Sequence, residues 1–170
     1  MRFVISGGGT AGHVNPALAV AQALRQEGHE VHYAGTPSGM EARLVTNDGF
    51  AYQPFNVAGF NRAKPLTLLT SSAKVANSAR QARSWLAELQ PDAVAGFGGY
   101  VSIPVGWAAS RLQIPLLIHE QNSAAGLANR FLARRAHAVA LTYDAAKSKL
   151  RTNGRLQLTG NPVRAALLEE

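Results

Sequence analysis

The residues best suited to do chemistry form a glycine-rich loop near the N-terminus. Residues 7–13 read Gly-Gly-Gly-Thr-Ala-Gly-His, directly after the apolar residues 3–5 and directly before Asn15 and Pro16. This order predicts a strand, a glycine loop and the start of a helix. Glycines let the backbone approach a ligand closely, and a helix N-terminus favours an anion. The loop therefore predicts a phosphate-bearing ligand, and His13 adds a group that can move a proton near neutral pH.

The same loop also fits a dinucleotide-binding motif, because Gly7, Gly9 and Gly12 have the spacing G-x-G-x-x-G. A nicotinamide or flavin site needs an acidic residue at the end of the second strand, where it binds the ribose. Here that strand ends in Tyr-Ala-Gly-Thr at residues 33–36, and Glu30 lies at its opposite end. The dinucleotide interpretation is therefore disfavoured, and no cofactor is predicted.

A second glycine loop repeats the layout of the first. Residues 96–102 read Gly-Phe-Gly-Gly-Tyr-Val-Ser, between a predicted strand and a predicted helix. Two helix N-termini that converge can bind a larger anion, such as a diphosphate. Gly98, Gly99 and Tyr100 therefore join the candidate site.

A third group of polar residues follows another predicted strand, at His119, Glu120, Gln121 and Asn122. A carboxylate and amides in this position could hydrogen-bond a polyhydroxylated ligand, or could cap the next helix. Asn129 has the same two interpretations. For His119, the last position of a buried strand favours a structural role.

The elements that must position these residues alternate between short β-branched runs and longer amphipathic runs. This alternation predicts an α/β fold, with a mainly parallel, doubly wound, Rossmann-like sheet and helices on both faces. Asn15 is predicted to cap the first helix, with Pro16 at its first position. Ligands of such sheets bind outside the carboxyl ends of the strands. Seven strands are expected at residues 2–6, 30–34, 51–55, 93–96, 116–119, 138–141 and 156–159. Six helices are expected at residues 16–26, 40–46, 65–89, 101–111, 125–133 and 144–150.

The composition is that of one compact domain. The chain has 170 residues, of which 46% are hydrophobic, so it can bury a core without disulfides. It has no cysteine, which fits a reducing compartment. We find no signal sequence and no apolar run of the roughly 20 residues that span a bilayer. These features predict a cytoplasmic protein.

The charge is basic and unevenly distributed. There are 17 Lys and Arg residues against 10 Asp and Glu, and residues 50–86 contain no acidic side chain. Such a surface attracts nucleic acid, anionic lipid or a phosphorylated substrate, or it is a solvated helix face. Nucleic acid is disfavoured, because no recognition motif accompanies the charge. The candidates for contact with an anionic membrane surface are Arg62, Lys64, Leu66, Leu69, Lys74, Arg80, Arg83 and Trp85.

The last residues differ from the rest. Gly160, Asn161 and Pro162 end the last predicted strand, and the stretch that follows has no obvious packing partner. We therefore interpret residues 1–160 as a Rossmann-like domain and residues 161–170 as the start of a linker to a second domain that is absent from this chain.

Four motifs together resemble the MurG family of bacterial glycosyltransferases. They are Gly-Gly-Thr-Ala-Gly-His at residues 8–13, Gly-Gly-Tyr-Val-Ser-x-Pro at 98–104, His-Glu-Gln-Asn-x-x-x-Gly-x-x-Asn at 119–129, and Gly-Asn-Pro-Val-Arg at 160–164. The resemblance spans the chain in order but covers only the N-terminal half of that family. It implies the acceptor-binding domain of a two-domain GT-B enzyme, with the donor domain absent. It also implies no metal, in agreement with the lack of an Asp-x-Asp motif.

The resemblance further implies a reaction and a set of site residues. MurG enzymes transfer N-acetylglucosamine from UDP-GlcNAc to lipid I, an undecaprenyl-diphosphate carrying a muramyl-pentapeptide, at the cytoplasmic face of the inner membrane. His13 and Glu120 are the implied catalytic residues. The implied substrate-binding residues are Gly8, Gly9, Thr10, Ala11, Gly12, Gly98, Gly99, Tyr100, Asn122, Asn129 and Arg164. By this resemblance, the chain alone is expected to be inactive.

Two interpretations outside the enzyme class remain open. The chain could be a stand-alone acceptor-binding subunit that acts with a separate donor-domain protein. It could instead be a non-catalytic module that binds a membrane surface through the basic residues between 62 and 83.

Overall fold

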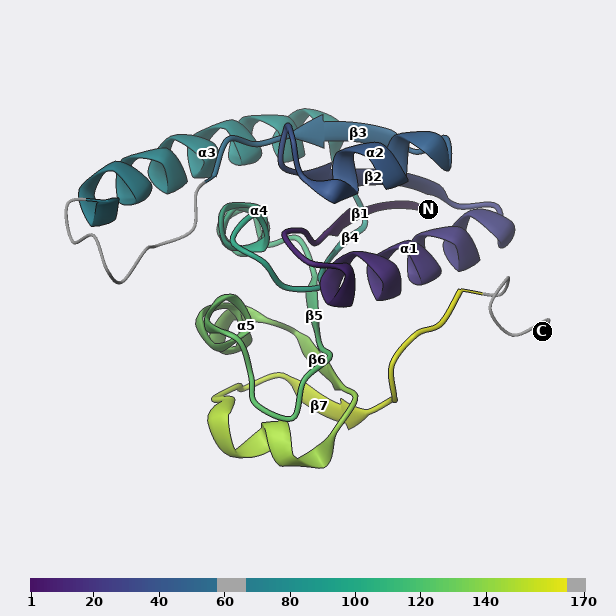
Figure 1. Cartoon of the computed structure of the whole chain (residues 1–170), viewed down its shortest axis with the longest axis vertical. Coiled ribbons are helices and arrows are strands. Elements are labelled where there is room, and N and C mark those ends of the chain that lie inside the picture. The colour runs from purple at the N-terminus through teal and green to yellow at the C-terminus, as the bar shows by residue number, and fades with distance from the viewer. Residues whose placement is uncertain (58–66, 165–170) are drawn as a thin grey trace.

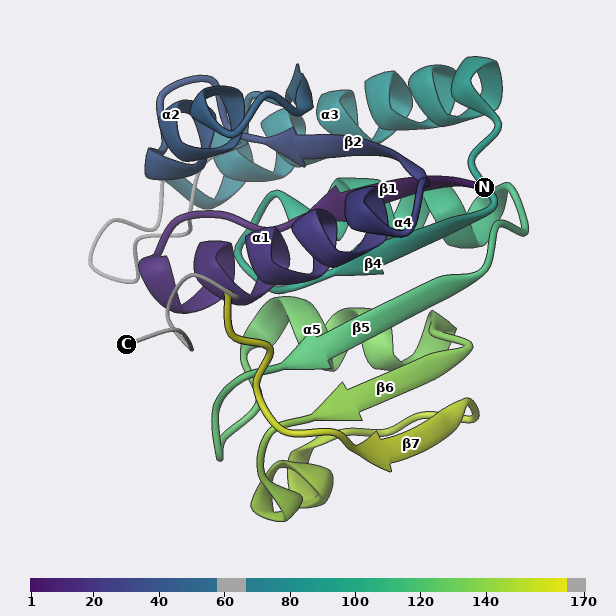
Figure 2. The same cartoon turned by 90° about the vertical axis from the view of Figure 1, so that its right-hand side faces the viewer.

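A computed structural model describes residues 1–57 and 67–164, without the side chains of residues 67–72. The described chain forms one sheet of seven parallel strands in the order β3-β2-β1-β4-β5-β6-β7 (Figures 1 and 2). The strands are β1 (Arg2–Ser6), β2 (Glu30–Gly35), β3 (Ala51–Pro54), β4 (Ala93–Gly96), β5 (Leu116–Glu120), β6 (Ala138–Leu141) and β7 (Arg155–Leu158). The predicted α/β class and doubly wound, parallel sheet are confirmed.

From β1 the chain adds β2 and β3 on one side of the sheet, and then β4 to β7 on the other side. Helices cover both faces of the sheet. The helices are α1 (Ala11–Gln26), α2 (Met40–Asn47), α3 (Thr67–Leu89), α4 (Ser102–Arg111), α5 (Leu127–Leu132) and the 3₁₀ segments η1 (Ala133–Arg135) and η2 (Asp144–Lys149). In Figure 2, α1 lies in front of the sheet, and α3, α4 and α5 lie behind it. Crossovers of this kind bury the strands on both sides, which explains their apolar, β-branched sequences.

Two apolar cores hold these layers together. One lies between the sheet and α3, α4 and α5, and contains Leu86, Val105 and Leu132. The other lies under α1 and α2, and contains Leu18 and Val45. Because all seven strands are parallel, their carboxyl ends lie along the same edge of the sheet.

The start of the first helix differs from the prediction. The helix α1 begins at Ala11 after Thr10, and the predicted cap at Asn15 is wrong. The N–H groups of His13 and Val14 both donate to the Thr10 carbonyl, at 3.1 Å each, so the helix already winds through the end of the glycine loop. Pro16 lies inside this helix, buried against the core. His13 therefore stands on the first turn of a helix and not on a loop before it. The predicted helix at residues 144–150 is also shorter and is 3₁₀ rather than α.

The C-terminal segment has a packing partner that the sequence did not predict. The guanidinium of Arg164 contacts the Asp48 carboxylate, with Nη2 and Oδ2 2.9 Å apart. Asp48 lies directly after α2, so the chain passes from β7 back toward α1 and α2 (Figure 1). Arg164 was predicted to bind substrate, but the structure places it in this ion pair, and it does not line the cleft described below. Contact of Arg164 with substrate therefore stays a prediction.

The basic surface candidates divide into three groups. Arg62, Lys64 and Leu66, and the side chain of Leu69, lie outside the described part of the structure. Lys74, Arg80 and Arg83 are exposed on α3.

Trp85 forms the third group and lies against the fold. It is half-buried and packs against the core, with its ring centroid 5.6 Å from that of Phe55 and 6.5 Å from that of His32. Its ring is therefore engaged in the fold, and contact of Trp85 with a membrane surface stays a prediction. Within the described residues, none of the helices combines the length and the apolar character needed to cross a membrane.

Candidate active site

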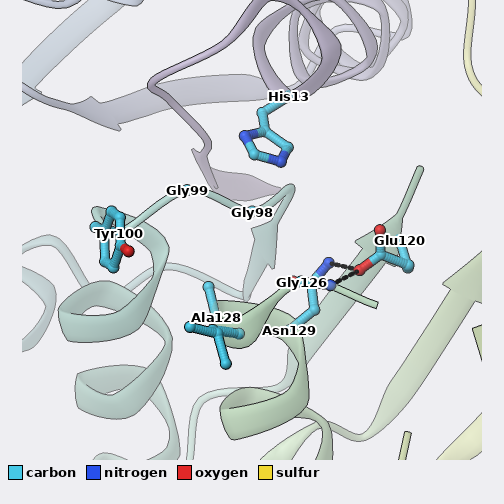
Figure 3. Close-up of a pocket in the computed structure, with 9 residues that line it drawn as sticks. His13, Gly98, Gly99, Tyr100, Glu120, Gly126, Ala128 and Asn129 are labelled. Atoms are coloured by element: carbon cyan, nitrogen blue, oxygen red, sulfur yellow. Dashed lines mark hydrogen bonds between the residues drawn. The ribbon is translucent and has the colours of Figure 1, made fainter. Parts of the chain in front are cut away.

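A cleft of about 180 Å³ opens at the carboxyl edge of the sheet, where β1, β4 and β5 end. Its walls come from the start of α1, the loop after β4 and the start of α5 (Figure 3). The lining residues are His13, Gly98, Gly99, Tyr100, Glu120, Gly126, Leu127, Ala128 and Asn129. Six of the predicted site residues thus meet in one place: His13, Gly98, Gly99, Tyr100, Glu120 and Asn129.

The two glycine loops touch one another. The Gly8 N–H donates to the Gly98 carbonyl at 3.3 Å. Gly98 and Gly99 have φ angles of +96° and +81°, which L side chains rarely adopt. A Cβ on Gly99 would lie 2.3 Å from the Gly8 carbonyl oxygen, so this contact requires glycine. The close approach of the loops brings the N-termini of α1 and α4 to the same cleft.

His13 is held by the loop from which its helix starts. Its Nδ1 lies 3.0 Å from the Gly8 carbonyl oxygen and 3.2 Å from the Thr10 hydroxyl. A carbonyl can only accept, so Nδ1 carries the proton in the bond to Gly8. In the neutral ring, Nε2 is then an acceptor, and this edge of the ring faces Gly98 across the cleft (Figure 3). The ring is therefore oriented with a basic nitrogen toward the site.

Glu120 lines the cleft, but its carboxylate is occupied by its own loop. Oε1 accepts from the backbone and side-chain N–H groups of Asn122 at 2.9 and 3.0 Å. Oε2 accepts from Gly126 N–H at 3.0 Å and from Asn129 Nδ2 at 2.9 Å (Figure 3). The side chain is buried, and four hydrogen bonds saturate it. The structure thus gives Glu120 a positioning role, and its predicted catalytic role stays a prediction.

The remaining polar residues of this loop are placed around Glu120. Asn122 is exposed and does not line the cleft, so its predicted contact with substrate is not supported. Asn129 is 2% exposed, and its Nδ2 also donates to the His119 carbonyl at 2.9 Å. Its Oδ1 has no hydrogen-bond partner among the described residues. A buried acceptor without a partner is costly, and a ligand hydroxyl could satisfy it.

His119 has the structural role that its position predicted. It is 2% exposed, its Nε2 donates to the Gly160 carbonyl at 3.0 Å, and its Nδ1 accepts from Gln121 Nε2 at 3.1 Å. Burial lowers the pKa of this imidazole, although the Gly160 carbonyl and the Glu120 carboxylate partly oppose the shift. His119 therefore stays neutral and ties β5 to the start of the C-terminal segment.

One residue of the site escaped the sequence analysis. Glu41, in the first turn of α2, is fully buried behind the first glycine loop. Its carboxylate accepts from Thr36 N–H at 3.0 Å, from the Thr36 hydroxyl at 2.6 Å and from Gly9 N–H at 3.4 Å. A Cβ on Gly8 would lie 2.5 Å from Glu41 Oε1. Glu41 thus supports the loop from behind, and a side chain at position 8 would have to displace its carboxylate.

The rest of the predicted substrate-binding loop lies beside the cleft. Gly9, Thr10, Ala11 and Gly12 are exposed; the first two lead into α1, and the last two are its first residues. They adjoin the site through His13 but are not part of its lining. Among the described residues, no group of three or more His, Asp or Glu side chains could hold a metal ion.

The profile of the glycosyltransferase family 28 N-terminal domain matches residues 3–141. The chain belongs to this family. The match contains both glycine loops, His13 and the whole 119–129 motif, so the cleft of Figure 3 lies within the family 28 domain.

Curated relatives of this family 28 domain share one name. They include a UDP-N-acetylglucosamine--N-acetylmuramyl-(pentapeptide) pyrophosphoryl-undecaprenol N-acetylglucosamine transferase from Halothermothrix orenii, which is 42% identical over 99% of this chain. The protein of that name from Acidovorax sp. strain JS42 is 44% identical over 98% of the chain. The chain spans only 46% and 40% of the lengths of these two proteins.

Solved structures agree with this assignment. The crystal structure of Acinetobacter baumannii MurG matches 95% of the chain and 46% of its own, with 36% identity and a TM-score of 0.80. The UDP complex of S. aureus MnaA matches 95% of the chain and 45% of its own, with 16% identity and a TM-score of 0.68, a likeness in fold alone. The family 28 domain therefore has the fold of the N-terminal half of a GT-B glycosyltransferase.

Proposed function

We propose that this chain is the acceptor-binding half of an inverting N-acetylglucosaminyltransferase. Its relatives are named for transfer of N-acetylglucosamine to an N-acetylmuramyl-(pentapeptide) pyrophosphoryl-undecaprenol. The complete reaction would take the sugar from UDP-GlcNAc and convert lipid I to lipid II for peptidoglycan. The observation that carries the proposal is the contact between the two glycine loops, with the basic nitrogen of His13 directed across it.

The diphosphate of the acceptor would bind where the loops meet. The N-terminus of a helix carries partial positive charge, and here two helices begin beside one cleft. Glycine at positions 98 and 99 keeps side chains out of the approach of an anion. The buried Oδ1 of Asn129, which has no partner among the described residues, would accept a hydroxyl of the bound sugar.

His13 would act as the general base. Its Nε2 would take the proton from the attacking hydroxyl of the acceptor, and the oxygen would form a bond to the anomeric carbon of the donor sugar. The bond from that carbon to UDP breaks on the opposite face, which inverts the configuration. General bases of this kind contribute roughly 10²- to 10⁴-fold to a rate. The donor contacts would come from a second domain.

A binding experiment with this chain tests the proposed function. We expect the chain to bind a soluble N-acetylmuramyl-pentapeptide diphosphate in calorimetry, and to transfer no sugar when UDP-GlcNAc is added. Absence of binding, or sugar transfer by the chain alone, would overturn the proposal.

The role of His13 needs a protein that contains both halves. There, His13→Ala should lower kcat by roughly 10²-fold or more, the range of a lost general base, while the melting temperature stays near that of the parent. Unchanged kcat would remove His13 from the base role.

We also propose that α3 faces the cytoplasmic surface of the membrane. Lys74, Arg80 and Arg83 are exposed along this helix, and anionic lipid attracts such residues by about 1 kcal/mol each. Binding to anionic vesicles should weaken in the variant R80Q/R83Q and at high salt, while neutral vesicles bind neither form. Equal binding of parent and variant would reject this surface.

A further inference from the structure

A second, larger hollow of about 490 Å³ lies next to the cleft, and nothing in the proposed reaction uses it. It runs along the outer side of α5 and η1 toward the residues after η2. Five cations line it, together with two apolar side chains: Arg130, Arg134, Arg135, Lys149, Arg151, Leu127 and Phe131. We call it the cationic groove.

In the part of the chain that the structure describes, the cations of the cationic groove have no ion-pair partner. Within residues 1–57 and 67–164, no carboxylate forms an ion pair with any of the five cations. The nearby Asp144 pairs with Lys147 instead. Arg135 is partly engaged, because its guanidinium stacks 4.3 Å from the Phe131 ring and donates to the Phe131 carbonyl at 3.1 Å. The groove therefore offers several charged donors to a ligand.

The apolar residues of the groove are exposed, although both are large. Leu127 is 53% exposed and Phe131 is 41% exposed. They lie four positions apart, so they project from one face of α5. The occupant should therefore combine an anionic group with apolar surface, as a peptide with a free carboxylate does.

The groove is continuous with the candidate active site. Leu127 lines both hollows, at the point where α5 begins. From Leu127 to Arg134 the helical rise is about 10 Å, and an extended peptide of five residues spans up to about 17 Å. A pentapeptide attached to a sugar in the cleft can therefore reach the far cations of the groove.

We propose that the cationic groove binds the peptide of the acceptor through its carboxylates. This inference rests on the proposed function, because the relatives' names place a pentapeptide on the acceptor sugar. Four of the five cations are arginines, whose planar guanidinium matches a carboxylate with two parallel hydrogen bonds. The continuity of the groove with the cleft favours a group attached to the bound sugar over a layer of lipid headgroups. The groove would thus select acceptors that carry an acidic peptide.

The test compares two soluble ligands, an N-acetylmuramyl-pentapeptide diphosphate and the same compound without the peptide. Their dissociation constants are measured by calorimetry for the parent chain, for R130Q/R134Q and for the control R43Q/R155Q. The control removes the same charge from two exposed arginines that do not line the groove. Circular dichroism checks that each variant is folded.

We expect the parent to bind the peptide-bearing ligand about tenfold or more tightly than the peptide-free one, a difference of about 1.4 kcal/mol. R130Q/R134Q should lose this preference and keep the parent affinity for the peptide-free ligand, whereas R43Q/R155Q should behave as the parent. Amidation of the peptide carboxylates should reproduce the loss with the parent protein.

Other outcomes overturn the inference, and they separate it from the proposed function. Equal affinity of the parent for both ligands would show that the groove does not bind the peptide, while the proposed function stands. Binding of neither ligand would reject both. If R130Q/R134Q keeps its preference for the peptide and loses binding to anionic vesicles, the groove is a membrane surface.

Discussion

The buried carboxylate of Glu41 illustrates how a single side chain can shape a ligand loop without touching the ligand. It lies under Gly8 and Gly9 and joins them to Thr36, at the end of β2. Because three donors converge on it, the loop is held from behind while its outer side stays free. The same logic applies to Glu120, whose four hydrogen bonds shape the loop from 121 to 126. Both carboxylates therefore hold the backbone of a loop in place: Glu41 holds the first glycine loop, and Glu120 holds the loop after β5.

Glu41→Gln should destabilise the protein. The amide NH₂ cannot accept the bonds that the carboxylate accepts, and a buried donor left unpaired costs about 1–3 kcal/mol. We expect a loss of that size in the free energy of unfolding, measured with urea. Glu88→Gln, at an exposed position of α3, is the matched control and should be neutral. If the two variants unfold alike, Glu41 does not support the loop.

His119 makes stability depend on pH. Burial lowers its folded pKa below the ordinary value of 6.5, so between these two values the unfolded chain binds the extra proton. Stability should therefore fall as the pH drops below about 6.5, and this contribution should level off once the pH is below the folded pKa. In His119→Gln, urea unfolding between pH 7 and pH 5 should show a smaller pH slope. An unchanged slope would assign the acid sensitivity to other groups.

At the scale of elements, the sequence predicted the layout well and the junctions less well. All seven strands were predicted to within two residues, because most are short apolar runs between turn residues; the edge strands β3 and β7 are more polar. The start of α1 was missed because Thr10, although Thr is a common N-cap, is followed by a first turn without an acidic residue, whereas Asn15 and Pro16 carry a stronger sequence signal for a helix start. The buried role of Glu41 was missed because an acidic residue in the first turn of a helix is usually exposed to solvent, where it interacts with the helix dipole. Its burial depends on contacts with residues 36 and 9, which only the fold brings together.

The junction of β4 and α4 should be intolerant of side chains. A methyl group at Gly99 would meet the Gly8 carbonyl at 2.3 Å and would also occupy a left-handed backbone conformation. Gly99→Ala should therefore cost about 1–3 kcal/mol of stability or more. It should also weaken binding of a diphosphate ligand. The control is Gly126→Ala, where φ is −68° and no atom lies within 4 Å of the added Cβ. Equal melting temperatures for both variants would contradict the close contact of the loops.

At the scale of the whole molecule, the C-terminal segment connects the two ends of the sheet. It leaves β7 at one edge and reaches Asp48, which follows α2 near the other edge (Figures 1 and 2). Asp48 also accepts from Gln22 Nε2 at 2.7 Å, so α1 takes part in the same junction. The sequence placed a linker here but could not predict its course, because an ion pair between residues 116 positions apart leaves no local pattern.

Asp48→Asn should loosen this segment and leave the domain folded. A partly exposed ion pair contributes about 0–1 kcal/mol, so the melting temperature should change little. Amide hydrogen exchange in residues 160–164 should become faster, because the segment loses its anchor. Asp144→Asn breaks an exposed pair with Lys147 elsewhere and should leave this exchange unchanged. Equal exchange in the two variants would show that Asp48 does not hold the segment.

The carbonyl oxygen of Gly8 has two neighbours that belong to different parts of the site. It accepts a hydrogen bond from the Nδ1–H group of His13, and a Cβ added at Gly99 would clash with it. A displacement of this one oxygen therefore turns the imidazole and shifts the second loop together. In a double-mutant cycle, His13→Ala and Gly99→Ala should be non-additive, because the second change acts on an arrangement that the first has already disturbed. His13 and the two glycine loops should thus behave as a single thermodynamic unit.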